Sequence, residues 1–316
     1  MKRSCSALMA IIFVIITLFH AVSCKWTPSY EFKDGALTIN GQKGMDDWAN
    51  DCRKEEGETQ TFQIKSEMKE LILKGDVLIV PTKAFADCFL LEQVTMSDSI
   101  NAIEDHAFDN DKSLKHIDWS QGLLSIGKYA FRRTAVETIA FPEGLLSINN
   151  FAFWGLPYLT EVILPDSLVK MDYAFSNCPK LEKIQIGSGI SYLGDFEFSE
   201  CESLRTLFVP KNITEIKERP LEGSGIERLI FEGTVEKITK FEITEDKYPS
   251  LRQVVFLDAP PTKTQHNMEA FLIDNHNITV FVLNEKLRLF YSEYEEEWGG
   301  VSIIGISSMD DIPALS

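Results

Sequence analysis

The sequence is short of positive charge. Lysine and arginine number 31 against 48 aspartate and glutamate residues, which gives a formal net charge of −17 at pH 7. Because nucleic acids and anionic lipid surfaces are bound largely through basic side chains, this balance argues against both as partners. Beyond the N-terminal segment there is also no apolar run of the ~20 residues that a helix needs to cross a bilayer.

Histidine and cysteine are scarce, at five and six residues. No Cys-x-x-Cys pair occurs, so zinc or thioredoxin-type chemistry has no support. Asp46, Asp47 and Asp51 lie close together in the sequence but match no calcium loop. Four histidines lie in no recognised nucleophile or zinc motif, and we expect them to be solvated: His106, His116, His266 and His276. The sequence thus predicts no catalytic, cofactor-binding or metal-binding residue.

The N-terminus carries an export signal. Lys2 and Arg3 precede an apolar run over residues 7–19, and residues 21–23 place small side chains at the positions that a signal peptidase requires. We therefore assign residues 1–23 to a signal peptide and expect an exported protein, either displayed at the cell surface or secreted.

Cys24 decides between two modes of export. If cleavage follows Ser23, Cys24 becomes the first mature residue and a candidate for lipidation, although Ala21 stands where a bacterial lipobox usually has leucine. A lipid on Cys24 would be the protein's membrane attachment. The alternative is a plain secreted chain in which Cys24 pairs with Cys52.

The most informative feature of the chain is an Ala-Phe motif that recurs every 22 or 23 residues. This spacing is kept by Phe85, Phe108, Phe131, Phe153, Phe175 and Phe198, and continued by Leu221 and Ile243. A period of roughly 20 to 29 residues with its own short strand indicates a leucine-rich repeat solenoid. Each coil of a solenoid buries its apolar side only against its neighbours, so residues 62–271 are predicted to form one elongated repeat array.

Each copy contains six residues of which the first, fourth and sixth are apolar, and this alternation predicts a short parallel β-strand with one buried face. Nine such segments begin at Met68, Leu91, Leu114, Val136, Leu159, Leu181, Leu204, Ile226 and Leu251. The small Ala beside each Phe predicts a tight bend in which the rings stack from coil to coil. The predicted fold is a solenoid of short strands joined by irregular, bend-rich connections.

Three cysteines follow the same register. Cys88, Cys178 and Cys201 each lie three residues after the Phe that ends a coil, which places them at one interior position. Cys178 and Cys201 fall in consecutive coils, where they could form a disulfide or remain as buried thiols. The sequence leaves both readings open.

The two ends depart from the repeat, because an uncapped terminal coil would expose its core. Residues 30–48 contain an Asp-Gly turn and predict a β-hairpin within an N-terminal cap over residues 24–61. Residues 272–316 are predicted to form an α/β C-terminal cap, with a strand over 278–283 and a helix over 285–295.

The outward positions of the strands carry the candidate binding site. In three consecutive coils the fifth strand position is apolar, which places Phe208, Ile230 and Val255 side by side. Arginines at neighbouring outward positions flank them: Arg205, Arg228 and Arg252. An apolar stripe rimmed by arginine has the composition of a protein-binding patch. Two alternatives are that these residues serve strand propensity alone, or that a cap folds over them.

The repeat pattern Ala-Phe-x-x-Cys-x-x-Leu-x-x-Val, followed by a turn with Pro or Gly, resembles the BspA-like, Treponema-type leucine-rich repeat family of surface and secreted proteins. Residues 34–41 and 278–282 resemble the units that flank such repeats, so the resemblance covers roughly residues 30–306. It implies export, display or release, and the binding of other proteins. The family's binding residues are not defined by a motif, so none can be transferred to this chain.

Three departures from the pattern predict irregular coils over residues 215–245. Leu221 replaces the Phe, Glu197 replaces the Ala before Phe198, and residues 217–220 interrupt the bend. Taken together, the sequence predicts a non-enzymatic, monomeric, exported protein that binds a protein partner or mediates adhesion. The alternative is a glycan-binding surface lipoprotein.

Overall fold

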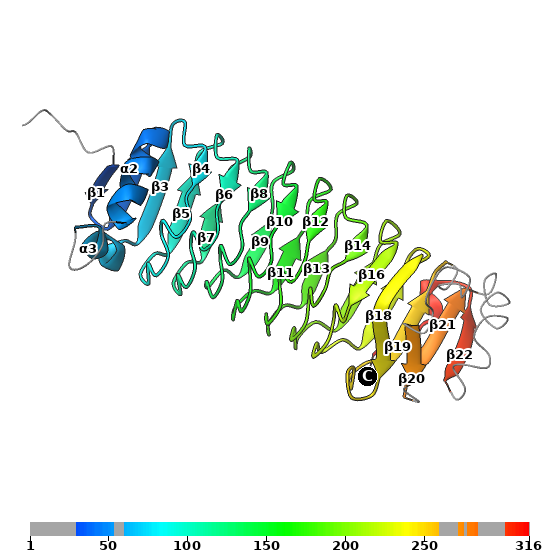
Figure 1. Cartoon of the computed structure of the whole chain (residues 1–316). Helices are drawn as coiled ribbons and strands as arrows, with labels where there is room; N and C mark the ends of the chain where they lie inside the picture. Colours follow the sequence, from blue (N-terminus) through cyan, green and yellow to red (C-terminus); the bar gives the residue numbers. More distant parts are fainter. Residues whose placement is uncertain (1–29, 54–59, 259–270, 275–276, 284–300, 316) are drawn as a thin grey trace, which may run out of the picture.

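The chain folds into an elongated stack of coils that begins with a hairpin and two helices and ends in a strand-rich unit (Figure 1). The computed structural model describes residues 30–53, 60–258, 271–274, 277–283 and 301–315. The predicted signal peptide, Cys24, His266, His276 and the predicted helix over 285–295 lie outside the described residues.

One side of the stack, here called the first face, carries the strands that the sequence predicts, and all nine are present. They are parallel and in register, for example Val162 beside Ile139 and Ile184. In order the nine are β3 (Glu70–Lys74), β5 (Gln93–Met96), β7 (His116–Asp118), β9 (Thr138–Ala140), β11 (Glu161–Ile163), β13 (Lys183–Gln185), β15 (Thr206–Val209), β17 (Arg228–Phe231) and β19 (Gln253–Phe256). Two strands near the C-terminal end, β21 (Thr279–Leu283) and β22 (Ser302–Ile306), continue the same face.

A second set of strands lies on the opposite side, where the sequence predicted irregular connections. These strands pair in parallel from coil to coil because each coil turns back into extended backbone at the same point. They are β4 (Ile79–Val80), β6 (Ala102–Ile103), β8 (Ser125–Ile126), β10 (Ser147–Ile148), β12 (Lys170–Met171), β14 (Tyr192–Leu193), β16 (Glu215–Glu218), β18 (Lys237–Thr244) and β20 (Phe271–Asp274). We call this side the second face.

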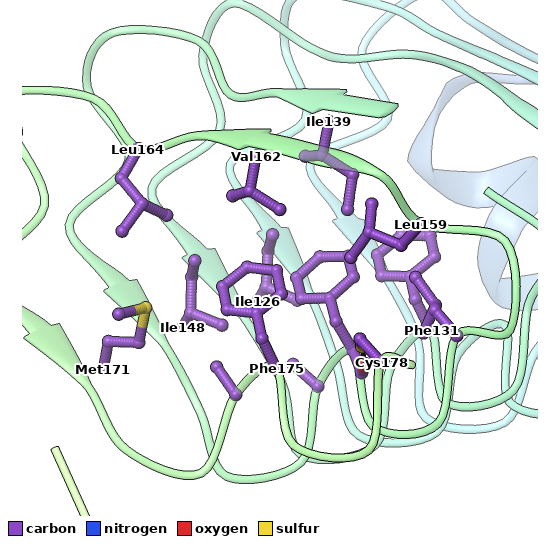
Figure 2. Packing of buried hydrophobic residues seen from close by; sticks show 14 of the residues in the cluster. Ile126, Phe131, Ile139, Ile148, Leu159, Val162, Leu164, Met171, Phe175 and Cys178 are labelled. Atoms are coloured by element: carbon purple, nitrogen blue, oxygen red, sulfur yellow. Dashed lines mark hydrogen bonds between the residues drawn. The ribbon is translucent and has the colours of Figure 1, made fainter. Parts of the chain in front are cut away.

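The predicted stack of Phe rings fills the space between the two faces (Figure 2). Phe131, Phe153 and Phe175 are fully buried, and their ring centroids lie 5.3 and 5.2 Å apart in nearly parallel planes. Aliphatic residues from both faces close over the rings, for example Val162 from β11 and Ile148 from β10. The repeated Phe therefore serves the core and is not available for binding.

Two residues in each coil hold the bends that flank the Ala-Phe pair. In the coil of Phe131, Tyr129 and Arg133 have φ values of 56° and 60°, in the left-handed region. The strain of a left-handed non-glycine residue is offset by a backbone ladder, because the Phe131 N–H donates to the carbonyl of Ala152 in the next coil at 2.8 Å. The same bond recurs along the stack, which explains why the bend is identical from coil to coil.

The N-terminal cap differs from its prediction. The hairpin consists of β1 (Tyr30–Lys33) and β2 (Ala36–Asn40), and it ends at Asn40 instead of continuing to Trp48. The next residues form helix α2 (Gly41–Arg53), and α3 (Gln60–Glu67) follows. The prediction was wrong there because Met45, Trp48 and Ala49 follow helical spacing and are all buried.

Trp48 supplies the first ring of the stack. Its indole ring stacks on Phe85 at 5.8 Å between centroids, and its Nε1–H donates to the Ala84 carbonyl at 2.9 Å. In later coils this carbonyl accepts from the N–H of the preceding coil's Phe, and the first coil has no predecessor. The helix therefore closes both the hydrophobic core and the backbone ladder at the N-terminal end.

The interior cysteines are free thiols. Cys88, Cys178 and Cys201 are buried and unbridged, so the disulfide reading of Cys178 and Cys201 is wrong. The Cys178 and Cys201 thiols donate to the carbonyls of Phe153 and Phe175, at 3.4 and 3.3 Å. Burial raises the pKa of Cys178 to about 12, which keeps this thiol protonated and unreactive in the folded protein.

The coils over 215–245 keep the pattern despite their altered residues. The Phe198 N–H donates to the Pro220 carbonyl at 2.8 Å, Arg219 takes the left-handed position with φ 48°, and Leu221 is buried. The expected irregularity consists of longer strands on the second face, four residues in β16 and eight in β18.

Candidate functional site

The predicted apolar column exists and is longer than predicted. Strand pairing places Phe208, Ile230, Val255, Phe281 and Ile304 in line across β15, β17, β19, β21 and β22. The exposure of these side chains varies sharply along the column. Phe208 is 51% exposed and Ile304 is 45% exposed, whereas Ile230 and Val255 are 1% and 0% exposed. The prediction of an open stripe is therefore correct for Phe208 and wrong for Ile230 and Val255.

A segment of the chain's own C-terminus covers the middle of the column. Residues 307–315, here called the C-terminal tail, leave β22 and cross the outward side of the strands. The tail and the outward side chains beneath it form a second apolar cluster that is separate from the core. Its members are Ile230, Val255, Phe281 and Ile306, with Leu257, Leu283, Met309 and Ile312 packed against them. The fold thus realises the alternative in which a cap folds over the stripe.

The three predicted arginines make contacts within the chain. Arg205 pairs with Glu227 at 3.3 Å and donates to a backbone carbonyl. Arg228 donates to the Gln253 side chain and to the Pro313 carbonyl of the tail, both at 2.5 Å. Arg252 donates to the carbonyls of Pro249 and Leu251. Of these three arginines, Arg228 is therefore the one that holds the tail.

The rest of the first face is open and polar. At the outward position that Phe208 occupies in its own coil, β7, β9 and β13 carry Asp118, Ala140 and Gln185, and all three are exposed. Ile163 of β11, at 37% exposure, is the other exposed large apolar residue at this position before Phe208. Phe208 therefore stands at the border between a polar surface and the tail-covered cluster.

The second face carries an exposed apolar row that was not predicted. Leu124, Leu146 and Val169 are 45%, 46% and 55% exposed and lie in consecutive coils. Their backbones are hydrogen-bonded to one another, since the Leu146 N–H donates to Leu124 O at 2.9 Å and the Val169 N–H to Leu146 O at 3.0 Å. The sequence held a signal for this row, because Leu124, Leu146 and Val169 recur at the repeat spacing directly before the paired strands β8, β10 and β12.

A second, half-buried ring stack runs along the bends. It consists of His106, Tyr129, Phe151, Tyr173 and Phe196, whose centroids lie 5.0 to 5.6 Å apart. Lys128 and Arg132 lie over Tyr129. Each ring packs against its neighbours in the row, and the Tyr129 face also carries two cationic side chains. Sugars stack on open ring faces, so this row does not favour the glycan-binding alternative.

The candidate chemical groups are used in structural contacts. His106 was expected to be solvated, but its Nδ1 bonds Asp109 at 2.8 Å, and Asp109 also accepts two bonds from Arg132. His116 lies exposed in β7, as predicted. Of the three aspartates that lie close together in the sequence near position 50, Asp47 pairs with Lys43 at 2.7 Å and Asp51 accepts from Tyr30 at 3.0 Å.

The described residues contain neither a metal site nor a membrane-spanning helix. Within that part of the chain, no group of three or more histidine, cysteine or acidic residues is arranged to hold a metal ion. The helices found there are likewise too short or too polar to span a bilayer.

The fold and its repeats define a leucine-rich repeat solenoid. The chain matches the BspA type leucine rich repeat region in six copies, over residues 58–173 and 124–247. These matches cover more than half of the 316 residues, and the chain belongs to this family. Members are usually surface or extracellular proteins that take part in protein interactions.

Solved structures of leucine-rich repeat proteins are similar to the chain. One from T. pallidum is 23% identical, with a TM-score of 0.42, over 67% of this chain and 86% of that one. One from Bacteroides ovatus is 18% identical, with a TM-score of 0.48, over 88% and 80%. The pneumococcal vaccine antigen PcpA is 13% identical, with a TM-score of 0.45, over 86% and 79%. No curated protein matches the chain.

Proposed function

We propose that this protein is a non-enzymatic, exported repeat protein that binds another protein through its first face, with Phe208 at the contact. The observation that carries the proposal is the exposure of Phe208, a large aromatic side chain that is 51% accessible on a structured sheet. The backbone of Phe208 is already ordered in β15 and its side chain has two rotatable torsions, so little conformational entropy is lost when a partner covers it. Phenylalanine, like tyrosine and tryptophan, is enriched in protein interfaces relative to the rest of the surface.

The surroundings of Phe208 suit a protein partner. Charged and polar side chains at the outward positions toward β7 supply a polar rim, and the Arg205–Glu227 ion pair adds charge at the start of β15 and β17. A buried aromatic centre with a polar rim is the usual make-up of a protein interface. The net charge of −17 further favours a partner with a basic surface, since complementary charge speeds association.

Changing Phe208→Asp is expected to reduce partner binding by a factor of about 30 or more, because hot-spot residues contribute at least ~2 kcal/mol. The fold should be unchanged, since the side chain makes no part of the core. A pull-down with the wild-type chain first identifies the partner, and titration calorimetry then compares the two proteins. Circular dichroism spectra check that the variant is folded.

Leu146→Asp is the matched control, because Leu146 is exposed to a similar degree, at 46%, on the opposite face. It should bind like wild type. Loss of binding in Leu146→Asp with retention in Phe208→Asp would move the interface to the second face and refute the proposal as stated.

Export and anchoring have a separate test. The basic, apolar and small-residue order of residues 2–23 supports cleavage before Cys24 and its lipidation. Labelled fatty acid is expected to enter the wild-type protein and not Cys24→Ala, and protease treatment of intact cells should remove the wild-type protein. Label retained by Cys24→Ala, or no label in either protein, would exclude a lipid on Cys24.

A further inference from the structure

The tail-covered part of the first face has features of a binding groove that is already occupied. Phe208 and Ile304 remain exposed at the two ends of the column, and the residues between them are sealed by the C-terminal tail. The contacts of the tail therefore show how this face can hold a peptide segment.

The tail does not serve to close the solenoid core. Strands β17, β19 and β21 send Leu229, Val254 and Val280 inward to the main core. The tail packs on the opposite side of the same strands, against Ile230, Val255 and Phe281, which belong to a different cluster. Its burial therefore covers a lateral face and is independent of the need to cap the last coil.

The tail is a short self-contained element. Residues 309–311 form one turn of 3₁₀ helix, which Ser308 and Asp311 cap reciprocally. The Asp311 carboxylate also accepts from the N–H groups of Ser307 and Ser308, at 2.6 and 3.0 Å. These bonds shape the tail from within and do not tie it to the sheet. A segment of this kind can leave and return as a unit.

The attachment of the tail to the face has a simple chemistry. Met309 and Ile312, three residues apart, provide the aliphatic contacts. The Pro313 carbonyl then accepts from Arg228 Nη2 at 2.5 Å and from Gln253 Nε2 at 3.2 Å. A proline at this point has no N–H to leave unpaired, and its carbonyl faces two donors. Beyond it a cavity of ≈ 350 Å³ lies between the last tail residues and Arg252, Gln253 and Thr279.

We propose that the outward side of β17, β19 and β21 is a docking groove for a peptide segment of a partner protein with two aliphatic side chains three residues apart followed by proline. The C-terminal tail occupies this groove in cis and must leave before the partner binds. Arg228 and Gln253 read the carbonyl of the proline, and the buried column receives the aliphatic side chains. This inference rests on the proposed function, because it extends the same face from Phe208 to the covered cluster.

Tethering explains why the groove is closed in the isolated chain. A segment joined by a short linker sees its site at an effective concentration of about 1 mM or more, so even a weak contact is occupied. A partner at lower concentration needs extra contacts to compete, and Phe208 lies next to the groove to supply one.

The test uses the full-length chain with Met309→Asp and Ile312→Asp, which leave the groove intact and remove the aliphatic contacts of the tail. A fluorescent peptide of residues 306–315 is titrated in trans and followed by anisotropy. The double variant is expected to bind the peptide about tenfold or more tightly than the wild-type chain, whose groove is occupied. A peptide with Asp at the positions of Met309 and Ile312 should bind neither protein. Adding Arg228→Ala to the double variant should abolish most of the gain.

Hydrogen exchange keeps the test decisive if the double variant folds poorly. In the otherwise unaltered chain, Arg228→Ala is expected to speed exchange of the amides over 309–312 about tenfold and to leave β11 and β13 unchanged. The proposal is overturned if a folded double variant binds the native peptide no better than wild type does, or if Arg228→Ala leaves tail exchange unchanged. Phe208→Asp should leave binding of this peptide unchanged. The role of Phe208 in partner binding and the docking of the peptide in the groove are therefore tested by different measurements, and either can fail without the other.

Discussion

Replacing Phe153 with alanine is expected to lower the free energy of unfolding by about 3–5 kcal/mol. The ring is fully buried at the centre of the stack, between Phe131 and Phe175, and Phe141 meets its edge at 5.5 Å. Alanine would leave a cavity that the neighbouring coils cannot fill, because the backbone ladder fixes the distance between them. The change is measured as the shift of the urea midpoint, at constant slope, by circular dichroism.

Phe208→Ala is the control for this substitution. It removes the same ring from an exposed position on β15, where truncation is expected to change stability by no more than about 0.5 kcal/mol. Equal losses in the two variants would show that the ring stack is not what holds the coils together. A smaller slope in Phe153→Ala would instead mean that the array unfolds in separate blocks on either side of the cavity.

The repeat core could be predicted from the sequence because its buried residues recur at a regular interval. Position by position, Phe85 to Phe198 recur at a fixed interval, and each must face the interior for its neighbours to be buried. The nine strands of the first face follow from the same register. The strands of the second face were missed, because two residues such as Ser147 and Ile148 carry too little periodicity to be distinguished from a bend.

The candidate site could be predicted only in part. Strand alternation places Phe208, Ile230 and Val255 on the outward side and says nothing of what lies above them. The covering residues Met309 and Ile312 are more than 50 residues away in the sequence and carry no pattern of their own. A contact of this range depends on the path of the chain after β22. In the N-terminal cap, by contrast, the helical spacing of Met45, Trp48 and Ala49 was present but was outweighed by the preceding Asp-Gly hairpin signal.

Glu197 is the least expected buried residue of the stack. It stands in the column that Ala107, Ala130 and Ala152 occupy in earlier coils, and it is fully buried. Its Oε1 accepts from the Ala174 N–H at 2.9 Å, while Oε2 has no hydrogen-bond partner among the described residues. The nearby Lys217 bonds Asp172 at 2.8 Å instead.

Burial, with a further contribution from the Asp172 carboxylate, raises the pKa of Glu197 well above its ordinary value. The protonated form is thus favoured in the folded protein, while the unfolded chain ionises near the usual ~4.3. The contribution of the Glu197 carboxyl to the free energy of unfolding is fully present below its pKa in the unfolded chain. It is lost as pH rises from there through its pKa in the folded protein. The loss can reach about 1.4 kcal/mol for each pH unit between the two values.

We therefore expect Glu197→Gln to be more stable than wild type at pH 8 and the difference to vanish near pH 4. Glutamine keeps an acceptor for the Ala174 N–H and cannot ionise, so the difference between the two proteins isolates this carboxyl from every other titrating group. Urea unfolding at intervals from pH 4 to pH 9 measures this difference.

Glu200→Gln, which removes an exposed carboxyl from the same coil, controls for the change in net charge. If the difference between Glu197→Gln and wild type stays constant with pH, or matches that of Glu200→Gln, Glu197 is ionised in the folded protein and the coil must supply it with a cation or water.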